Sequence, residues 1–268
     1  MMNDFTVLLP VYYRDCPQRF QAALDSVVRN CVKPTELLIV ADGPLTIELD
    51  SVINSFHSEV KFNVLRLSNN CGLAAALNKG LEAIRTTYTI RADADDINHP
   101  HRFKLLMEKL VAGFDVVGSA VNEVDVDGSV IALKRCPLEP FEIRKFVKRR
   151  NPFNHMSVGF RTASVKSVGG YPEFFLREDY GLWAKMLVDG AKVCNLEQTL
   201  VNATTGSEFY SRRGGLKYAL GEIRFQRYLA DIGIKSISEA IFDGFLRFFV
   251  FVSPSFLRRS VYLRLLRR

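Results

Sequence analysis

Short apolar runs alternate with segments of helical periodicity through the first half of the chain. This alternation restricts the fold more than any other feature of the sequence. The expected strands cover residues 5–9, 36–40, 60–65, 88–91 and 115–118, and the expected helices cover residues 17–30, 46–56, 72–84 and 101–111. Regular alternation of this kind favours an α/β fold whose sheet is mostly parallel and covered by helices.

The pattern changes after residue 120. The expected elements there are strands at 121–126 and 129–133, a helix at 178–188, a strand at 198–203 and helices from residue 212 onward. Asp127-Gly128, between the first two strands, is a dipeptide typical of hairpin turns. We therefore expect an α/β domain over residues 1–205 and a helical, basic and apolar extension over residues 206–268.

Composition excludes several classes of protein. With 48% apolar and 24% charged residues, the chain can bury a sizeable core and is not disordered. Its five cysteines are scattered and never spaced Cys-x-x-Cys, which favours reduced thiols in the cytosol over disulfides or a zinc site. The N-terminal residues lack the pattern of a signal peptide. The apolar stretch at 245–252 is far shorter than the roughly 20 residues that span a bilayer, so we expect no transmembrane segment.

The net charge of +7 is concentrated at the C-terminal end of the sequence. Residues 247–268 contain six arginines and no acidic residue, namely Arg247, Arg258, Arg259, Arg264, Arg267 and Arg268. The remaining 30 basic and 29 acidic residues nearly cancel, which argues against a nucleic-acid-binding body. A basic tail rich in Phe and Leu instead predicts contact with an anionic membrane surface. On a helical wheel the arginines of 256–268 do not gather on one side, so packing between helices stays open as the alternative.

Three carboxylates follow a short apolar strand, in the sequence Arg91-Ala92-Asp93-Ala94-Asp95-Asp96. Ligands of open α/β sheets bind at the carboxyl ends of strands, which is where this cluster is expected. Such carboxylates can share one Mg²⁺ or Mn²⁺ with the phosphates of a substrate. The alternative is a polar turn in which Asp96 or Asn98 caps the next helix.

A second acidic pair, Glu178-Asp179, begins a segment of helical spacing. A carboxylate at a helix start is stabilised by the helix dipole whatever the function. The functional alternative is a general base, if a substrate hydroxyl comes within hydrogen-bonding distance.

Three further segments lie at expected strand ends or at a helix start. Pro10-Val11-Tyr12 ends the first strand, Asp42 follows the second, and Asn70 to Gly72 opens a helix whose N-terminus can bind an anion. Individually these are ordinary turn residues. The chain contains no dinucleotide Gly-x-Gly-x-x-Gly after a strand, no phosphate-binding Gly-x-x-x-x-Gly-Lys-Ser/Thr loop and no Gly-x-Ser-x-Gly elbow.

Taken in order, these segments resemble the signature motifs of family 2 glycosyltransferases of the GT-A fold, bacterial enzymes that build surface polysaccharide from nucleotide sugars. The similar segments are residues 7–12, 38–44, 70–80, 90–102 and 151–183, so the resemblance covers about residues 5–205. It implies a single Rossmann-like nucleotide-binding domain with a mixed, mostly parallel central sheet.

The resemblance also implies roles for individual residues. The acidic cluster looks like the Asp-x-Asp metal motif, with Asp95 and either Asp93 or Asp96 holding Mg²⁺ or Mn²⁺ against the donor diphosphate. Glu178-Asp179 looks like the catalytic-base motif, with Asp179 removing the proton of the acceptor hydroxyl. The residues expected to bind the nucleotide sugar are Pro10, Val11, Tyr12, Asp42, Asn70, Gly72, Asn78 and Asp93.

The acceptor side is expected to include His155, Glu178 and Trp183. A hydrogen-bonded structural role is an equal alternative for His155. The spacing of Trp183 with Leu187 on one helix face favours packing in the core over stacking on a sugar.

The sequence departs from the family pattern at two positions. Ala41 stands where the second strand usually ends in a first acid, which leaves Asp42 to contact the base, and Gly181 stands where another Asp often precedes Leu-Trp. The Gln-x-x-Arg-Trp signature of processive members is absent, which favours addition of a single sugar.

The implied activity is that of a metal-dependent, inverting hexosyltransferase. It would move a sugar, from a UDP-sugar by preference, to a hydroxyl of a glycan or a polyprenyl-linked acceptor. The expected location is the cytoplasm, peripheral on the inner face of the cell membrane. The alternatives are a catalytically inactive GT-A-like protein that binds membrane surfaces, and a nucleotidyltransferase, which would need an N-terminal Gly-rich loop that this chain lacks.

Overall fold

The computed structural model describes residues 4–205 and 215–252. Contacts within the chain divide it into two units. The sheet unit comprises the residues up to Glu173 together with Glu178–Thr204. The helical unit comprises Phe174–Arg177 and the residues from Thr205 onward. That a short segment ahead of residue 178 groups with the C-terminal helices was not predicted from the sequence.

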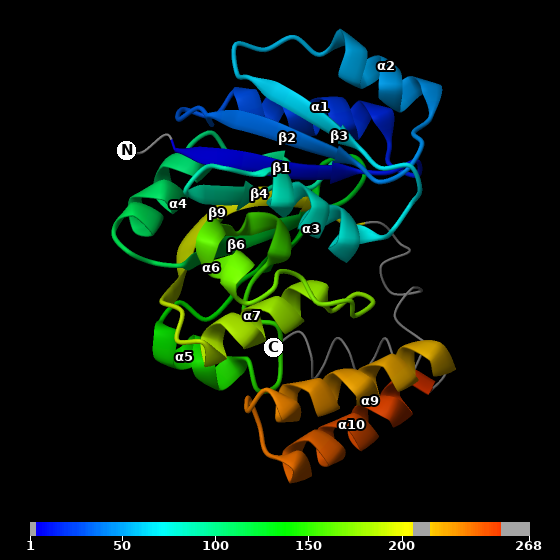
Figure 1. Cartoon of the computed structure of the whole chain (residues 1–268), viewed down its shortest axis with the longest axis vertical. Helices are drawn as coiled ribbons and strands as arrows, with labels where there is room; N and C mark the ends of the chain where they lie inside the picture. Colours follow the sequence, from blue (N-terminus) through cyan, green and yellow to red (C-terminus); the bar gives the residue numbers. More distant parts are fainter. Residues whose placement is uncertain (1–3, 206–214, 253–268) are drawn as a thin grey trace. The chain divides into compact units, whose positions relative to one another are not determined.

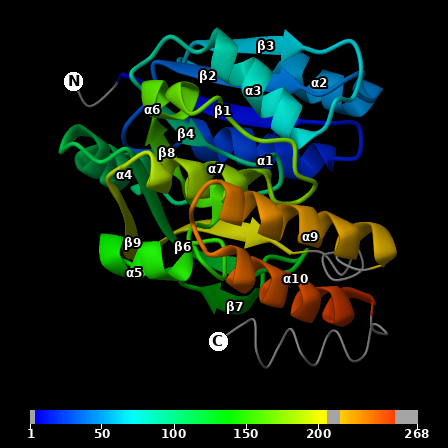
Figure 2. The same cartoon turned by 60° about the horizontal axis from the view of Figure 1, so that its bottom comes forward.

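The sheet unit is built on one mixed sheet with the strand order β3-β2-β1-β4-β8-β6-β9-β5, and β7 pairs with β6 (Figures 1 and 2). The strands are β1 (Phe5–Val11), β2 (Glu36–Ala41), β3 (Phe62–Arg66), β4 (Tyr88–Arg91), β5 (Ile97–Asn98), β6 (Val116–Val124), β7 (Val130–Lys134), β8 (Gly159–Arg161) and β9 (Val193–Thr204). The pairs among β1 to β4 are parallel, as is the pair β6–β9, whereas β8 runs antiparallel between β4 and β6. The expected mixed, mostly parallel sheet is therefore present.

Helices follow the strands in the order that the sequence predicts for the first half. They are α1 (Pro17–Val28), α2 (Ile47–Ser55), α3 (Leu73–Ala83), α4 (Arg102–Val111), α5 (Pro140–Phe146), the 3₁₀ turn η1 (His155–Ser157), α6 (Thr162–Ser167), α7 (Glu178–Val188), α9 (Leu216–Asp231) and α10 (Ile237–Val252). Two strands are longer than expected. Strand β6 runs without interruption into the predicted hairpin, and β9 begins five residues before residue 198.

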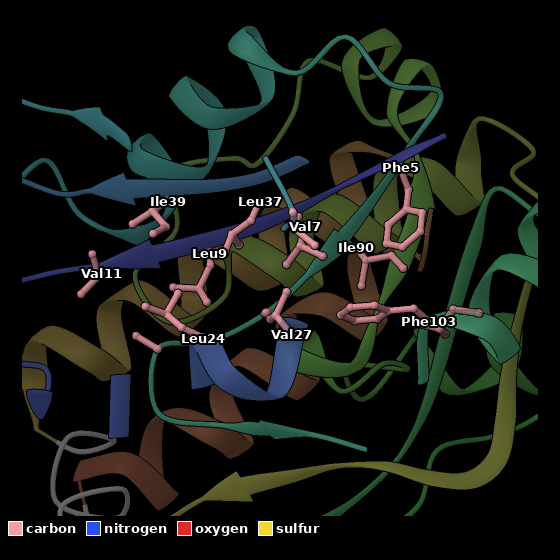
Figure 3. Packing of buried hydrophobic residues seen from close by; sticks show 14 of the residues in the cluster. Phe5, Val7, Leu9, Val11, Leu24, Val27, Leu37, Ile39, Ile90 and Phe103 are labelled. Atoms are coloured by element: carbon pink, nitrogen blue, oxygen red, sulfur yellow. The ribbon is translucent and has the colours of Figure 1, made fainter. Parts of the chain in front are cut away.

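The core of the sheet unit lies on both sides of β1. Val7, Leu9 and Val11 pack with Leu24 and other side chains of α1, as Figure 3 shows from close by. On the opposite face, α3 approaches so closely that a Cβ on Gly80 would lie 2.5 Å from Leu8 Cδ1. Burial on both faces explains why β1 is apolar throughout rather than alternating.

The alternative in which Asp96 or Asn98 caps the helix after the acidic cluster is wrong. The N-cap position of α4 is His101, and its side chain makes no capping hydrogen bond. Asp96 accepts a hydrogen bond from the backbone of Thr204, and the Asn98 amide donates to Ser26 Oγ over 2.8 Å. Both side chains therefore hold strands and helices of the sheet unit together.

The helical unit is formed by the paired helices α9 and α10. Ala219, Phe225 and Leu229 of α9 are buried, whereas many apolar side chains of α10 are exposed. Across 4–205 and 215–252, none of the helices combines the length and apolarity needed to cross a membrane. Arg258, Arg259, Arg264, Arg267 and Arg268, and the helix expected at 256–268, lie outside the described residues.

Candidate active site

The carboxyl ends of β1, β2 and β4 meet at one edge of the sheet. Parallel pairing places Val11 beside Ala41 and Leu8 beside Arg91. The residues that follow these strands therefore emerge together, which is the position predicted for Tyr12, Asp42 and the acidic cluster.

Asp42 fixes the start of α3. Its carboxylate accepts hydrogen bonds from the backbone N–H groups of Cys71 (2.7 Å) and Gly72 (3.0 Å). The amide of Asn70 returns a hydrogen bond to the carbonyl of Asp42 over 3.1 Å. Gly43 completes the contact, because a Cβ there would lie 2.6 Å from the backbone nitrogen of Asn70. Three of the residues predicted to bind nucleotide, Asp42, Asn70 and Gly72, thus form one small structure at the edge.

The end of β1 brings in a carboxylate that the sequence analysis missed. The Tyr12 N–H donates to the Asp15 carboxylate over 2.8 Å, and the Asp15 N–H donates to the Tyr12 carbonyl over 3.0 Å. Burial raises the pKa of Asp15 to about 7, and the charges of Asp95 and Asp93 act in the same direction. The available signal was an acid three residues after Tyr12, a spacing that suits a turn. We call Asp15, Asp93, Asp95 and Asp96 the acidic edge.

Two buried arginines shape the acidic edge. Arg91 has no exposed surface, and its guanidinium forms an ion pair with Asp93 and donates to the carbonyl of Ala92. Arg102 is equally buried and donates to the carbonyl of Arg91 over 2.6 Å. Burial lowers the pKa of Arg102 to about 9, so it remains charged at neutral pH.

Asp95 and Asp96 are tied to the end of β9. Thr204 donates from its backbone N–H to the Asp96 carboxylate over 2.9 Å and from its hydroxyl to the Asp95 carbonyl over 2.6 Å. Burial, followed by the charge of Asp93, raises the pKa of Asp95 to about 6. The same two causes raise the pKa of Asp96 well above its usual range. The positive charge of the buried arginines therefore does not fully compensate the carboxylates of the acidic edge.

A divalent cation fits this arrangement if a ligand supplies part of its coordination. Among the described residues, no three His, Cys, Asp or Glu side chains gather closely enough to hold a metal by themselves. Mg²⁺ and Mn²⁺ are commonly held by one or two carboxylates with substrate phosphates completing the shell. Asp93 and Asp95 retain partial exposure, and Asp96 keeps a buried Oδ2 without a hydrogen-bond partner. Asp93 and Asp95 are thus the side chains open to such a cation.

A hollow of about 170 Å³ lies beside Asp95. Arg19 of α1, Asn202 and Thr204 of β9, and the hairpin turn between β6 and β7 line it. Part of this lining, the hairpin turn, comes from a segment that the sequence analysis did not connect with the site.

The carboxylates at the start of α7 face the same region. Asp179 accepts hydrogen bonds from the side-chain amide of Asn151 and from the Tyr180 N–H (2.7 Å), and it is more open than Glu178, which is buried. The charges of both Asp93 and Asp179 act on the imidazole of His155 and on Tyr171. Asp95 and Asp179 are 84 residues apart in the sequence, but the acidic edge and the N-terminus of α7 therefore lie near the same buried side chains.

His155 belongs to an aromatic cluster. Its Nε2 lies 3.2 Å from the Tyr171 hydroxyl, and its ring packs against Tyr171 and Trp183. Burial lowers the pKa of His155 to about 4, which keeps the imidazole neutral at pH 7.

Two predicted site residues have structural roles here. Trp183 is 1% exposed and is surrounded by Phe153, His155, Phe160 and Tyr171, so its ring is not open to a sugar. Asn78 donates to the Tyr171 carbonyl and accepts from the Tyr171 N–H, each over 2.8 Å. The Asn78 amide therefore joins α3 to the segment after α6.

Sequence comparison finds relatives along nearly the whole chain. The family model described as glycosyl transferase family 2 matches residues 6–169. A UDP-Gal:alpha-D-GlcNAc-diphosphoundecaprenol beta-1,3-galactosyltransferase of Escherichia coli is 37% identical over 98% of this chain and 97% of its own length. The amylovoran biosynthesis glycosyltransferase AmsE of Erwinia amylovora is 34% identical over 83% of this chain and 84% of its own.

Solved structures resemble the fold at low identity. Staphylococcus aureus TarS 1-349 in complex with UDP-GlcNAc matches with a TM-score of 0.70 and 16% identity, over 98% of this chain and 76% of that one. The mannosyltransferase PcManGT of Pyrobaculum calidifontis, in complex with GDP-Man and Mn2+, matches with a TM-score of 0.61 and 17% identity, over 98% and 70%. At these identities the likeness concerns the architecture alone.

Proposed function

The chain belongs to glycosyl transferase family 2 and has the expected GT-A fold, and on this premise we propose that it transfers one sugar, with inversion, from a UDP-sugar to a lipid-linked acceptor. The family and the relatives place it among glycosyltransferases of bacterial polysaccharide synthesis. The donor, the acceptor, the stereochemistry and the metal are the parts that we propose.

One observation carries the mechanism. The segment 151–158 links Asp93 and Asp179, because the Asn151 amide donates to Asp179 and the Val158 carbonyl accepts from the N–H of Arg91, whose side chain pairs with Asp93. A donor diphosphate near Asp93 and an acceptor hydroxyl near Asp179 would therefore lie close to each other. Transfer needs this proximity, because the attacking oxygen has to reach the anomeric carbon directly.

The donor end would be bound by the structure around Asp42. Asp42, Tyr12 and the Asn70–Gly72 loop lie at the strand ends and are suited to hold the nucleoside, with the N-terminus of α3 nearby. Asp95 and Asp93 would hold Mg²⁺ or Mn²⁺ together with the donor phosphates. When bound, such a cation would offset the negative charge of the departing nucleoside diphosphate.

Asp179 would act as the general base. Its carboxylate is held by Asn151 and by the Tyr180 N–H and remains partly exposed. As the acceptor oxygen bonds to the anomeric carbon and the bond to the diphosphate breaks, the hydroxyl proton would pass to Asp179. His155 stays neutral and would orient the acceptor without itself removing the proton.

The relative from Escherichia coli suggests the substrate class. Its name assigns it UDP-Gal as donor and GlcNAc on a lipid diphosphate as acceptor, and the identity of 37% extends over nearly all of both chains. We propose the same class here, namely a UDP-hexose and a sugar carried on a lipid diphosphate.

The test is a panel of UDP-galactose, UDP-N-acetylglucosamine and GDP-mannose with Mn²⁺ or Mg²⁺. The acceptor is α-linked N-acetylglucosamine on a short-chain lipid diphosphate, and the product is read by mass spectrometry. Transfer of a single hexose from a UDP-sugar supports the proposal. Absence of turnover with every donor, in a protein that still binds lipid, would favour the inactive membrane-binding alternative.

Asp179→Asn tests the base. Transfer should fall by about 10²- to 10⁴-fold, while the thermal shift caused by UDP and Mn²⁺ persists. Glu108→Gln, an exposed acid on α4, is the control and should leave both unchanged. Full transfer by the Asp179→Asn variant would refute the assignment.

We further propose that the protein binds the inner face of an anionic membrane through its helical unit. Ile241, Phe242, Phe245 and Phe249 of α10 are each more than half exposed and recur at helical spacing. We call these four residues the outer face of α10. An apolar face of this kind enters the boundary between lipid headgroups and acyl chains, and the arginines that follow in the sequence would each add about 1 kcal/mol at an anionic surface.

A further inference from the structure

The four residues ahead of Glu178 and the proposed base Asp179 belong to the helical unit. Phe174–Arg177 groups with α9 and α10, and the next residues in the chain are Glu178 and Asp179 at the start of α7. The helical unit therefore holds the segment from which α7 begins.

Both ends of this segment are anchored. The Phe174 ring packs on Phe225 and Tyr228, with ring centres 5.4 and 4.8 Å apart. Arg177 forms an ion pair with Glu222 and donates to the Tyr218 hydroxyl over 3.2 Å. Its guanidinium also lies over the ring of Phe225, at 5.4 Å from the centre.

Glu222 is the centre of this anchor. Its side chain is fully buried, and besides Arg177 it binds Arg247 Nη1 at 3.2 Å and the amide of Gln226 at 2.7 Å. A buried carboxylate is tolerated only when charged or hydrogen-bonding partners surround it, and this one has two arginines. The position of Arg177 is therefore strongly determined.

The backbone between the anchors is strained. Leu176 has a φ of +57°, which residues with a Cβ rarely adopt, and the Arg177 N–H closes the turn on the Phe174 carbonyl over 3.0 Å. Such a conformation persists only where its surroundings impose it. Phe174 and Arg177 impose it here.

We propose that Glu222, acting through Arg177, is a positioning residue for the Asp179 carboxylate. The inference rests on the proposed function of Asp179 as the base. Asn151 and the Tyr180 N–H hold Asp179 from within the sheet unit, and the anchored turn fixes the point at which α7 starts. Coupling runs along the chain itself, over the two peptide bonds that join Arg177 to Asp179.

The test compares the full-length Arg177→Met, Arg177→Lys and Glu222→Gln variants with wild type, using UDP-galactose and the short-chain lipid-diphosphate acceptor. A displacement of about 1 Å at a reacting group costs on the order of 100-fold in rate, so we expect a loss of that size in kcat for Arg177→Met. The KM for the donor should change by less than about two-fold, because the donor residues are untouched. Arg177→Lys keeps the positive charge next to Glu222 and should therefore retain part of the kcat that Arg177→Met loses.

Asp243→Asn is the matched control. Asp243 pairs with Lys235 at 2.6 Å at the far end of the same buried network and does not contact Arg177. This variant should lose thermal stability but keep the wild-type kcat below its melting temperature. Wild-type kcat in a folded Arg177→Met protein would overturn the proposal.

Hydrogen exchange gives a second measurement that needs no substrate. The amides of residues 176–181 should exchange faster in Arg177→Met than in wild type or Asp243→Asn. Unchanged exchange in Arg177→Met would refute the anchor even if the wild-type protein transferred no sugar. Faster exchange in a chain without transferase activity would instead refute the proposed function and leave the anchor standing.

Discussion

The acidic edge of the sheet unit and the network around Glu222 in the helical unit both bury charge, but with opposite balance. At the acidic edge, burial and mutual repulsion raise the pKa values of Asp15, Asp95 and Asp96 despite the nearby arginines. In the helical unit, Glu222 lies between two arginines and Lys235 pairs with Asp243.

The difference separates the proposed binding site, at the acidic edge, from a network that stabilises the fold. Uncompensated carboxylates reduce stability, and they are retained where a ligand supplies the missing positive charge. Compensated charges fix geometry, and removing one partner leaves the other buried without compensation. Removing a charge should therefore lower the free energy of unfolding in the network around Glu222 and raise it, without ligand, at the acidic edge.

The largest expected effect is a loss of stability in the helical unit. Glu222→Leu removes the carboxylate between Arg177 and Arg247, and we expect a loss of about 3 kcal/mol in the free energy of unfolding. Urea unfolding measures it. Asp231→Asn breaks the exposed pair with Arg227 and should cost less than about 0.5 kcal/mol. Equal losses of unfolding free energy in Glu222→Leu and Asp231→Asn would contradict a structural role for the buried network.

The next effect is stabilisation of the sheet unit by ligand. UDP with Mn²⁺ at about 100 times the dissociation constant should add roughly 2.7 kcal/mol, seen as a rise in melting temperature. The rise should shrink strongly in Asp95→Asn, which removes a carboxylate open to the cation. An undiminished rise in that variant would exclude Asp95 from the cation site.

A smaller effect of opposite sign is expected without ligand. The pKa of Asp95 is about 6 in the folded protein and lies near 3.8 when unperturbed. The folded chain therefore binds more protons between these values, so raising the pH through this window lowers stability. Asp95→Asn avoids this loss and should be more stable than wild type at about pH 7.5, on the order of 1 kcal/mol, with a smaller difference near pH 4. Thermal unfolding in a chelator, at several pH values, measures the difference. A stability difference between Asp95→Asn and wild type that stays constant from about pH 4 to 7.5 would contradict the raised pKa of Asp95.

The smallest change in stability is expected on the outer face of α10. Replacing Phe242 and Phe245 with Gln should alter the free energy of unfolding by less than about 0.5 kcal/mol, because both rings are exposed. The same double variant should lose co-sedimentation with anionic liposomes. Ile47→Gln, at a still more exposed apolar position on α2, is the control and should bind like wild type. Undiminished liposome binding by the double variant would exclude the outer face of α10 as the contact.

Local patterns in the sequence account for much of the sheet unit. Apolar runs and helical spacing predicted β1 to β4 with α1 to α4 because these elements bury or partly bury apolar side chains at regular intervals. The strand ends then predicted where Asp42 and Asp95 lie. Short elements such as β8 and α6 were not predicted, because three to six residues are too few to show a periodic pattern.

What the sequence could not predict depends on contacts between distant residues. Asp15 joins the acidic edge only because β1 pairs with β4. Arg177 and Glu222 are 45 positions apart, and no local pattern connects them. Trp183 was expected to favour the core, and it is buried as helical spacing suggests. The use of Asn78 to bind the Tyr171 backbone required the full structure.

The close approach of Gly43 to Asn70 has a consequence for redesign. A side chain at position 43 would collide with backbone 2.6 Å away, and the carboxylate of Asp42 holds the opposite side of the same loop. The turn after β2 and the loop before α3 therefore cannot be exchanged separately. Chimeras intended to test the proposed nucleotide site should take residues 41–44 and 69–72 together from a single parent.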